Sequence, residues 1–360
     1  MPMIGKRSKL SRGFKPLGHC IYFGVWTTLS LWRVGMQIAV IGASGLIGNN
    51  LCRALLEKGM KVKALVHINS NSLERLDVEK VRGDILDIAC LGKFLQGVDV
   101  VFHAAGKISI DGDKDGSVRA VNVTGTKNIV EACLSSGVQR LVYFSSIHAL
   151  QQQPEEELDE NRALVDDEGF LHDMAKSDAE REVMKGIAQG LDAVILNPTA
   201  AVGPFDFQPS FIGQGLIALY NRKIPTLIDG GFDWIDVRDI AKAAIAAMEK
   251  GKSGERYVIS GMWKTVKELA LLVQEITGKP APKFTTPQWL ARMGIPLAKA
   301  YSFITHTPML YTNETLEVLV RCNRNISSLK ARRELGFYPR PLAETLNDTI
   351  EWHKKIGSIR

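Results

Sequence analysis

The 360-residue chain lacks the cysteine patterns that build disulfide frameworks or zinc sites. It has no CxxC pair and no Cys/His spacing of the zinc type, and its cysteines are scattered, at Cys20, Cys52, Cys90, Cys133 and Cys322. Disulfides are therefore not expected, and the composition fits a reducing cytoplasm. We expect the cysteines to be small buried apolar residues. No cluster of metal ligands is visible, so no metal site is predicted.

The sequence also lacks a hydrophobic run that could cross a membrane. The apolar run CIYFGVWTTLSLW, residues 20–32, has 13 residues, whereas a membrane-spanning helix needs about 20. No small-residue cleavage site of a signal peptide is seen. We expect residues 1–35 to be an N-terminal extension outside the fold. A membrane-surface anchor is the alternative, because basic and aromatic residues suit such an interface.

Acidic residues are missing from the N-terminal segment alone. Residues 1–35 hold six basic residues and no acid, which accounts for the whole net charge of +6. The rest of the chain has 39 basic and 39 acidic residues and is therefore neutral. Nothing in it predicts binding to nucleic acid.

From residue 36 onward, apolar runs alternate with helical patterns. Residues 36–41 form a continuous apolar run, which is typical of a strand buried on both faces. A glycine-rich turn follows, and then a helix that ends at Gly59. Further strands are expected at 61–67, 98–106, 140–146 and 191–198, with a helix through 122–137. This alternation predicts right-handed crossovers and a parallel sheet.

The turn GASGLIG joins the first strand to the first helix. Gly42, Gly45 and Gly48 permit a tight turn and a close approach of backbone N–H groups to a phosphate. The helix N-terminus adds partial positive charge, so a pyrophosphate is expected there. The motif has the strand–turn–helix context that a dinucleotide site needs. The sequence therefore predicts an α/β fold with a Rossmann-type, doubly wound parallel sheet.

The pattern becomes less regular after Pro198. We assign residues 36–198 to the dinucleotide-binding Rossmann domain, to which a short strand and a helix at 234–251 return. Residues 199–233 and 252–360 are expected to form a smaller, mixed α/β, substrate-binding part. Its elements include a helix that starts at a threonine cap and stops at Gly278, and a last helix at about 342–355.

The residues after the second strand bear on the choice of nicotinamide cofactor. An acidic residue there would bond the ribose 2′-hydroxyl and favour NAD, whereas a basic one would accommodate a 2′-phosphate. The stretch LVHINSNS has His67 and no acid, and its Asn69, Ser70 and Ser72 can donate to phosphate oxygens. NADP is therefore favoured over NAD. A solvated polar loop is the alternative interpretation.

Several segments occur in an order that is typical of one enzyme family. They are GASGLIG, GDILD (83–87), FHAAGKISI (102–110), VNVTGT (121–126), VYFSSIHAL (142–150), LNPTAAVGP (196–204) and ARRELGFYPRPLAETLNDTIEW (331–352). With them the chain resembles the extended short-chain dehydrogenases/reductases, in the dihydroflavonol-reductase-like branch of the NAD-dependent epimerase/dehydratase family. The resemblance runs from residue 36 almost to the C-terminus.

This resemblance implies a set of cofactor contacts. Asp84 would accept a hydrogen bond from the adenine amino group and Ile85 would lie beside the ring, with a loop or helix cap as the alternative role for Asp84. Asn122 would tie neighbouring strands to the active-site backbone. The full expected set is Gly42, Ser44, Gly45, Leu46, Ile47, Gly48, His67, Asp84, Ile85, Ala104, Ala105, Gly106, Asn122, Lys176, Asn197, Pro198 and Thr199.

The resemblance also implies three catalytic positions, one of them altered. Ser146 in VYFSSIHAL matches the serine that holds the carbonyl oxygen. Lys176 in LHDMAKSDAE matches the lysine that grips the nicotinamide ribose and lowers the pKa of a tyrosine. The tyrosine position holds His172, and the following SDAERE is expected to be a charged helix face.

Histidine is a different acid from tyrosine. Lys176, one helical turn away, would keep His172 neutral, and neutral imidazole is a weaker proton donor than imidazolium. Imidazole also reaches less far than phenol, so a bridging water is expected. His148, two residues after Ser146, is the other histidine candidate.

Three functions remain open from the sequence. The favoured one is an NAD(P)-dependent oxidoreductase that transfers hydride between nicotinamide and a carbonyl or alcohol substrate. The alternatives are a non-catalytic dinucleotide-binding sensor or scaffold, and an epimerase or dehydratase of the same fold. The partner is expected to be a small molecule, and a homodimer is left open.

The C-terminal part is rich in aromatic residues that could line an apolar pocket for the substrate. Most are expected to be core instead: Phe205, Phe207, Phe211, Phe232, Trp234, Trp263, Trp289, Tyr301, Phe303 and Tyr311. The acidic segment 150–170 runs into His172, and we expect it to form a lid over the site.

Overall fold

A computed structural model of the chain describes residues 35–359 apart from 109–111, 114, 167–168 and 306–311. Residues 36–360 form one compact unit, which begins where the first strand is predicted to begin. The expectations for residues 1–34, Cys20 included, lie outside the described residues. Among the described residues no helix is long and apolar enough to cross a membrane, and no three metal-binding side chains gather. Cys52, Cys90, Cys133 and Cys322 are free thiols.

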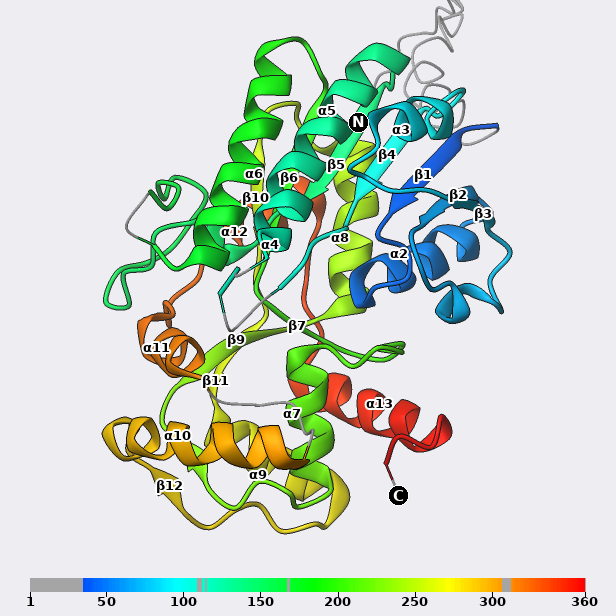
Figure 1. Cartoon of the computed structure of the whole chain (residues 1–360). Helices are drawn as coiled ribbons and strands as arrows, with labels where there is room; N and C mark the ends of the chain where they lie inside the picture. Colours follow the sequence, from blue (N-terminus) through cyan, green and yellow to red (C-terminus); the bar gives the residue numbers. More distant parts are fainter. Residues whose placement is uncertain (1–34, 109–111, 114, 167–168, 306–311, 360) are drawn as a thin grey trace, which may run out of the picture. The chain divides into compact units, whose positions relative to one another are not determined.

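Seven parallel strands form the central sheet, in the order β10-β6-β5-β4-β1-β2-β3 (Figure 1). They are β1 (Gln37–Ile41), β2 (Lys61–Val66), β3 (Glu79–Arg82), β4 (Val100–His103), β5 (Arg140–Phe144), β6 (Ala193–Pro198) and β10 (Arg256–Ile259). The strand order reverses at β1, which pairs with β2 on one side and with β4 on the other. In doubly wound folds the ligand lies at the carboxyl ends of the strands at this switch point. The predicted fold class is confirmed.

Helices cover both faces of this sheet (Figure 1). One face carries α2 (Leu46–Glu57), α8 (Val237–Lys250) and α12 (Leu329–Leu335), and the other α3 (Ile88–Phe94), α5 (Gly125–Ser136) and α6 (Leu171–Ala188). Strand β1 serves both cores, because Ile38 and Val40 point to the first and Ala39 and Ile41 to the second. This double burial explains the continuous apolar run at 36–41.

The second part of the unit is built from two short sheets and a group of helices (Figure 1). Strands β7 (Ala200–Val202), β9 (Gly231–Asp236) and β11 (Met262–Thr265) form one sheet, and β8 (Leu227–Ile228) pairs with β12 (Thr285–Thr286). The helices are α7 (Phe211–Tyr220), α9 (Val266–Thr277), α10 (Gln288–Thr305), α11 (Asn313–Arg321) and α13 (Leu342–Lys355). Helix α9 starts at a capping box of Thr265 and Glu268 and stops at Gly278 in the left-handed conformation, as its sequence predicts.

The position of strand β10 differs from the predicted division of the chain into two parts. Residues 252–360 were expected to belong to the substrate-binding part, but β10 pairs with β6 in the central sheet, and α12 packs in the core beneath α8. Conversely, the short strand predicted near residue 234 is β9, which pairs with β7 and β11 and not with the central sheet. A four-residue apolar run such as RYVI carries too little periodicity to assign it to a sheet.

Candidate active site

The glycine turn packs directly against the end of β4. Gly42 has a φ of +90°, and a Cβ on it would lie 2.4 Å from the backbone nitrogen of Ala105. A Cβ on Gly48 would lie 2.2 Å from the Gly42 carbonyl oxygen. Helix α2 begins at Leu46, and its N-cap Gly45 has no side chain, so the first backbone N–H groups are left without side-chain partners. This arrangement suits a phosphate at the helix N-terminus.

The loop after β2 is tied to the same turn. The Ser44 hydroxyl donates to the Asn69 carbonyl at 2.9 Å, and Asn49 Nδ2 donates to the Ser72 carbonyl at 2.9 Å. Ser72 is buried, and its hydroxyl donates to the Ser44 carbonyl at 3.2 Å. The Ser72 proton is therefore engaged within the protein, which removes Ser72 from the candidate phosphate donors. Asn69 Oδ1 accepts from the Asn71 N–H at 2.8 Å.

His67 and Asp84 face each other at the edge of the expected adenosine site. His67 Nε2 lies 3.4 Å from Asp84 Oδ2, and both side chains are exposed. The other Asp84 oxygen accepts from the Leu86 N–H at 2.9 Å, which is the local loop role left open by the sequence. Ile85 packs against the start of α5, where a Cβ on Gly125 would lie 2.5 Å from Ile85 Cδ1.

Asn122 fixes the chain that continues from β4. It lies in the short π-helical turn Ala120–Thr124 and is buried. Its Oδ1 accepts from the Lys107 N–H and its Nδ2 donates to the Lys107 carbonyl, both at 2.8 Å. A Cβ on Gly106 would lie 3.1 Å from Asn122 Oδ1 and 3.2 Å from Lys176 Nζ. The end of β4, the π-helical turn and α6 therefore meet at Gly106.

Lys176 and His172 lie one turn apart on α6, so their side chains share one side of the helix. Burial lowers the pKa of Lys176 to about 8, and the carboxylate of Glu180 opposes this shift. Burial also lowers the pKa of His172 to about 3, and the charges of Lys176 and His148 add to the effect. His172 is therefore a neutral imidazole at pH 7. Its Nδ1 is buried and has no hydrogen-bond partner among the described residues.

The two serines after β5 have different surroundings. Ser145 is buried and donates its hydroxyl to Glu180 Oε2 at 2.5 Å. Ser146 Oγ accepts from the His148 N–H at 3.1 Å, which caps the short 3-10 turn Ile147–Ala149. The Ser146 hydroxyl accepts in this bond, so its own proton can still be donated to a substrate oxygen.

Glu180 is a site residue that the sequence did not indicate. The segment SDAERE was expected to be a charged helix face, but Glu180 has no exposed surface. Besides Ser145 it accepts from Asn197 Nδ2 at 2.9 Å, and its Oε1 accepts from Arg256 Nε at 2.6 Å. The spacing from His172 to Lys176 to Glu180 is four residues twice, which places all three on one helix side. That spacing was the available signal.

Thr199 joins the end of β6 to the C-terminal part. Its N–H donates to the Ile259 carbonyl at 3.1 Å, and its hydroxyl donates to Asp233 Oδ1 at 2.6 Å. Burial raises the pKa of Asp233 to about 6, against the hydrogen bonds from Thr199 and Gly261. Next to Thr199, Asn197 Nδ2 also donates to the Ser146 carbonyl at 3.0 Å. Asn197 is thereby held in one network with Glu180 and the two serines, and Thr199 is held separately by Asp233 and Ile259.

The described part of segment 150–170 is anchored to its surroundings. Leu158 is fully buried, its N–H donates to the Asn325 carbonyl, and Glu160 Oε1 accepts from the Val258 N–H at 2.9 Å. These contacts anchor the segment at Leu158 and Glu160, and its role as a lid stays a prediction. The segment borders a hollow, which we call the polar hollow, lined by residues that include His148, Gln151, Phe170, Asp173, Val318 and Arg321. Within it, His148 Nδ1 lies 3.9 Å from Asp173 Oδ1.

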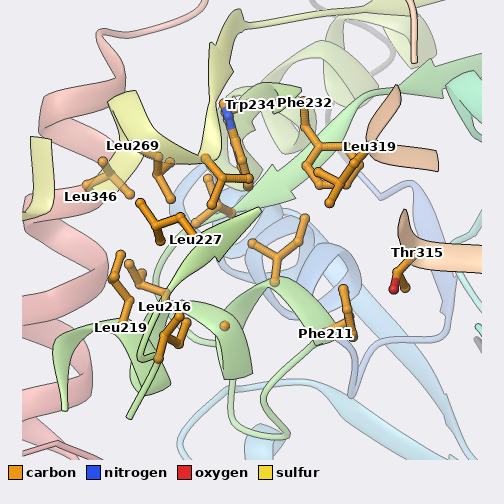
Figure 2. Close-up of a pocket in the computed structure, with 15 residues that line it drawn as sticks. Phe211, Leu216, Leu219, Leu227, Phe232, Trp234, Leu269, Thr315, Leu319 and Leu346 are labelled. Carbon is orange, nitrogen blue, oxygen red and sulfur yellow. The ribbon is translucent and has the colours of Figure 1, made fainter. Parts of the chain in front are cut away.

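The aromatic residues of the C-terminal part lie in different surroundings. Phe211, Phe232 and Trp234 line an apolar pocket (Figure 2). Phe205 and Phe207 pack edge-on against Trp352, and Arg324 lies over Trp263. Trp289 is exposed, and the side chains of Tyr301, Phe303 and Tyr311 lie outside the described residues.

The chain belongs to the NAD dependent epimerase/dehydratase family, whose model matches residues 38–260. It is 33% identical over 332 residues to "Sterol demethylase protein B" of Methylococcus capsulatus, covering 90% of this chain and 100% of that protein. It is 30% identical over 338 residues to a "Putative dihydroflavonol 4-reductase" of Synechocystis sp., covering 89% and 95%. The solved structure titled "Crystal structure of gox2253" is 29% identical, with a TM-score of 0.78, and covers 90% of this chain and 99% of that one. The resemblance inferred from the motifs is confirmed, and the chain is a member of a family of NAD(P)-dependent reductases, epimerases and dehydratases.

Proposed function

We propose that this protein is an NAD(P)-dependent oxidoreductase that transfers hydride between nicotinamide and a carbonyl or alcohol substrate. One observation carries the proposal. Lys176, with its pKa lowered to about 8, lies against Gly106 and Asn122 at the carboxyl end of β4. The same helix places His172 one turn before it and Glu180, which holds Ser145, one turn after it. A lysine whose pKa is lowered this far by burial is found most often at a functional site, where its charge takes part in binding or catalysis.

The residues present fit a dinucleotide. The turn from Gly42 to Gly48 would hold the pyrophosphate, and Asp84 and Ile85 would lie at the adenine. Gly106 and Lys176 would lie at the nicotinamide ribose, with Asn197, Pro198 and Thr199 bordering the ring. When bound, the reduced nicotinamide supplies the hydride. We favour NADP, because His67 at the end of β2 is exposed and no acid follows β2 before residue 74.

Proton delivery is the step that the change from tyrosine to histidine alters. Ser146 would donate its hydroxyl proton in a hydrogen bond to the substrate oxygen. His172, with a pKa of about 3, does not act as imidazolium at neutral pH. Lys176 is protonated at pH 7 and is an acid of suitable strength. We place the proton source at Lys176 and a relay at His172, where one ring nitrogen accepts a proton as the other gives one to a water on the substrate.

The non-catalytic alternative is favoured by the same pKa of His172, because a neutral imidazole is a weak acid. Turnover decides between the two. NADPH and NADH binding is followed by fluorescence, and oxidation of each is measured with a panel of aldehydes and ketones. We expect turnover that is lost in Lys176→Ala, reduced in His172→Ala and raised in His172→Tyr. Dinucleotide binding without turnover, in the native protein and in His172→Tyr, would support the sensor instead.

A second histidine provides the control. His353 in α13 is buried and, like His172, has ring nitrogens without partners among the described residues. His353→Gln should leave turnover unchanged. If His172→Ala behaved like His353→Gln and His172→Tyr gave no gain, His172 would have no part in proton transfer.

A further inference from the structure

The apolar pocket in the C-terminal part has no role in the mechanism above. It lies among α7, α9, α11, α13 and the strands β7 to β9 (Figure 2). The space inside it that a water-sized sphere can occupy is about 100 Å³. Of its 15 lining residues, all but Gly215, Trp234 and Thr315 have hydrocarbon side chains. Several of them, including Phe211 and Ile224, keep part of their surface exposed, so the pocket is reachable from solvent.

The polar atoms at the edge of this pocket are already used. Trp234 Nε1 donates to the Lys264 carbonyl at 2.9 Å. Thr315 Oγ1 accepts from the Thr312 N–H at 2.7 Å and donates to the Thr312 carbonyl at 3.0 Å, within the cap of α11. A ligand with hydroxyl or phosphate groups would find no free partner on these side chains and would lose its hydrogen bonds to water. The lining therefore suits a hydrocarbon. Figure 2 shows that the side chains around the pocket consist almost entirely of carbon.

Gly215 leaves open space beside α7 that no side chain of the described residues fills. It lies in the middle of α7, where glycine is less stable than alanine, and a Cβ on it would meet nothing within 4 Å. Gly213 on the same helix differs, because its Cβ would lie 2.3 Å from Asp206 Oδ2. A helix glycine that packing does not require lowers the stability of the helix, and an unfilled apolar space lowers the stability of the fold. Both occur here at the same place. This coincidence indicates room kept for a ligand.

Two elements connect this pocket to the proposed reaction centre. Helix α11 contributes Leu319 to the pocket, and its preceding residue Val318 lines the polar hollow with His148 and Asp173. Strand β7 continues from β6, so Val202, which lines the pocket, follows Thr199 by three residues, or about 10 Å of extended chain. A substrate whose carbonyl is held at Ser146 would have to extend past Thr199 to place an apolar group in the pocket.

We propose that the apolar pocket binds the hydrocarbon portion of the carbonyl substrate. The substrate would then be a ketone or aldehyde with an extended apolar group, and not a sugar nucleotide, whose phosphates and hydroxyls need charged and polar partners. This inference rests on the proposed function, since it places the reacting end of the same molecule at Ser146, His172 and Lys176.

Unbranched alkan-2-ones of increasing chain length provide the kinetic test, followed by NADPH oxidation. We expect kcat/KM to rise up to about fourfold for each methylene until the chain fills the pocket. Gly215→Leu should shorten the chain at which the rise stops, and Gly215→Ala should have a smaller effect. Gly92→Leu is the matched control, because Gly92 is also in a helix, with nothing within 4 Å of its Cβ, but lies in α3. Cooperative thermal unfolding and unchanged NADPH binding verify that each variant is folded.

A binding measurement separates failure of this inference from failure of the proposed function. The matching alkan-2-ols are titrated calorimetrically into the NADPH complex, where chain-length-dependent binding with a negative heat-capacity change is expected. Turnover without chain-length dependence, or unaffected by Gly215→Leu, would overturn the pocket assignment and leave the reductase proposal standing. Binding that depends on chain length and is lost in Gly215→Leu, without any ketone reduction, would support the pocket and refute the reductase.

Discussion

The ammonium group of Lys176 lies directly beside the space that Gly106 leaves by having no side chain. A Cβ on Gly106 would lie 3.2 Å from Lys176 Nζ and 3.1 Å from Asn122 Oδ1. Gly106 follows β4 and Lys176 lies on α6, so the contact joins the two elements that would grip the nicotinamide ribose. The position of the lysine thus depends on a residue that carries no chemistry of its own.

The contact between Gly106 and Lys176 predicts what one added methyl group at residue 106 would do. In Gly106→Ala, the new Cβ would press on two polar atoms at distances tighter than ordinary van der Waals contact. We expect Lys176 to move and kcat/KM to fall about tenfold, which corresponds to about 1.4 kcal/mol in the transition state. Steady-state kinetics with NADPH measures the loss. Gly92→Ala, at an open helix position, is the control. Equal kinetics in both variants would contradict the role assigned to the contact.

The pKa of Lys176 predicts the basic limit of the pH profile. The lysine is a cation below its pKa of about 8 and loses its charge as the pH rises through that value. We therefore expect kcat/KM to fall above about pH 8. The Glu180 carboxylate raises the pKa of Lys176, so Glu180→Gln should move this limb to lower pH. Glu182→Gln changes a carboxylate on the same helix that pairs with Lys185 and should not move it. A profile that stays in place in Glu180→Gln would refute the assignment to Lys176.

Arg256 predicts a stability effect that distinguishes a buried ion pair from a surface pair. Its guanidinium binds the fully buried Glu180 through Nε at 2.6 Å and Nη2 at 2.5 Å. Arg256→Met would leave that carboxylate uncompensated, and we expect a loss of about 3–5 kcal/mol in the free energy of unfolding. Lys354→Met removes an exposed partner of Glu351 and should cost less than about 1 kcal/mol. Denaturant unfolding measures both losses, and similar values would show that Glu180 is not effectively buried.

The sequence was sufficient to predict five strands of the central sheet and the glycine turn, because these depend on local patterns, whereas β3 and β10 were not predicted. The apolar run at 36–41 and the GASGLIG turn need only neighbouring residues to be recognised. Glu180 was not predictable in the same way. Whether a glutamate is buried or solvated depends here on Arg256, which is 76 residues away on a strand too short to identify.

The same limit applies to polar loops. Ser72 carries a hydroxyl that could donate to a phosphate, but the fold directs it to the Ser44 carbonyl. The apolar pocket was still harder to predict from the sequence, because its walls come from many elements between β7 and α13. A list of aromatic residues cannot show that Phe211 and Phe232 enclose a space while Phe207 packs on Trp352.

His67 predicts the choice between the two nicotinamide cofactors. Its imidazole is exposed at the end of β2, 3.4 Å from Asp84 Oδ2, where the ribose 2′ position is expected. In His67→Glu, an acid would repel a 2′-phosphate and could accept from a 2′-hydroxyl. We expect the Kd for NADPH to rise at least tenfold, about 1.4 kcal/mol, with little change for NADH. Fluorescence titration at fixed ionic strength measures both, since salt screens such effects. Lys58→Gln lowers the net charge at an exposed site at the other end of α2 and serves as the control. An unchanged NADPH/NADH ratio in His67→Glu would remove the basis for favouring NADP, because the 2′ group would then lie away from the end of β2.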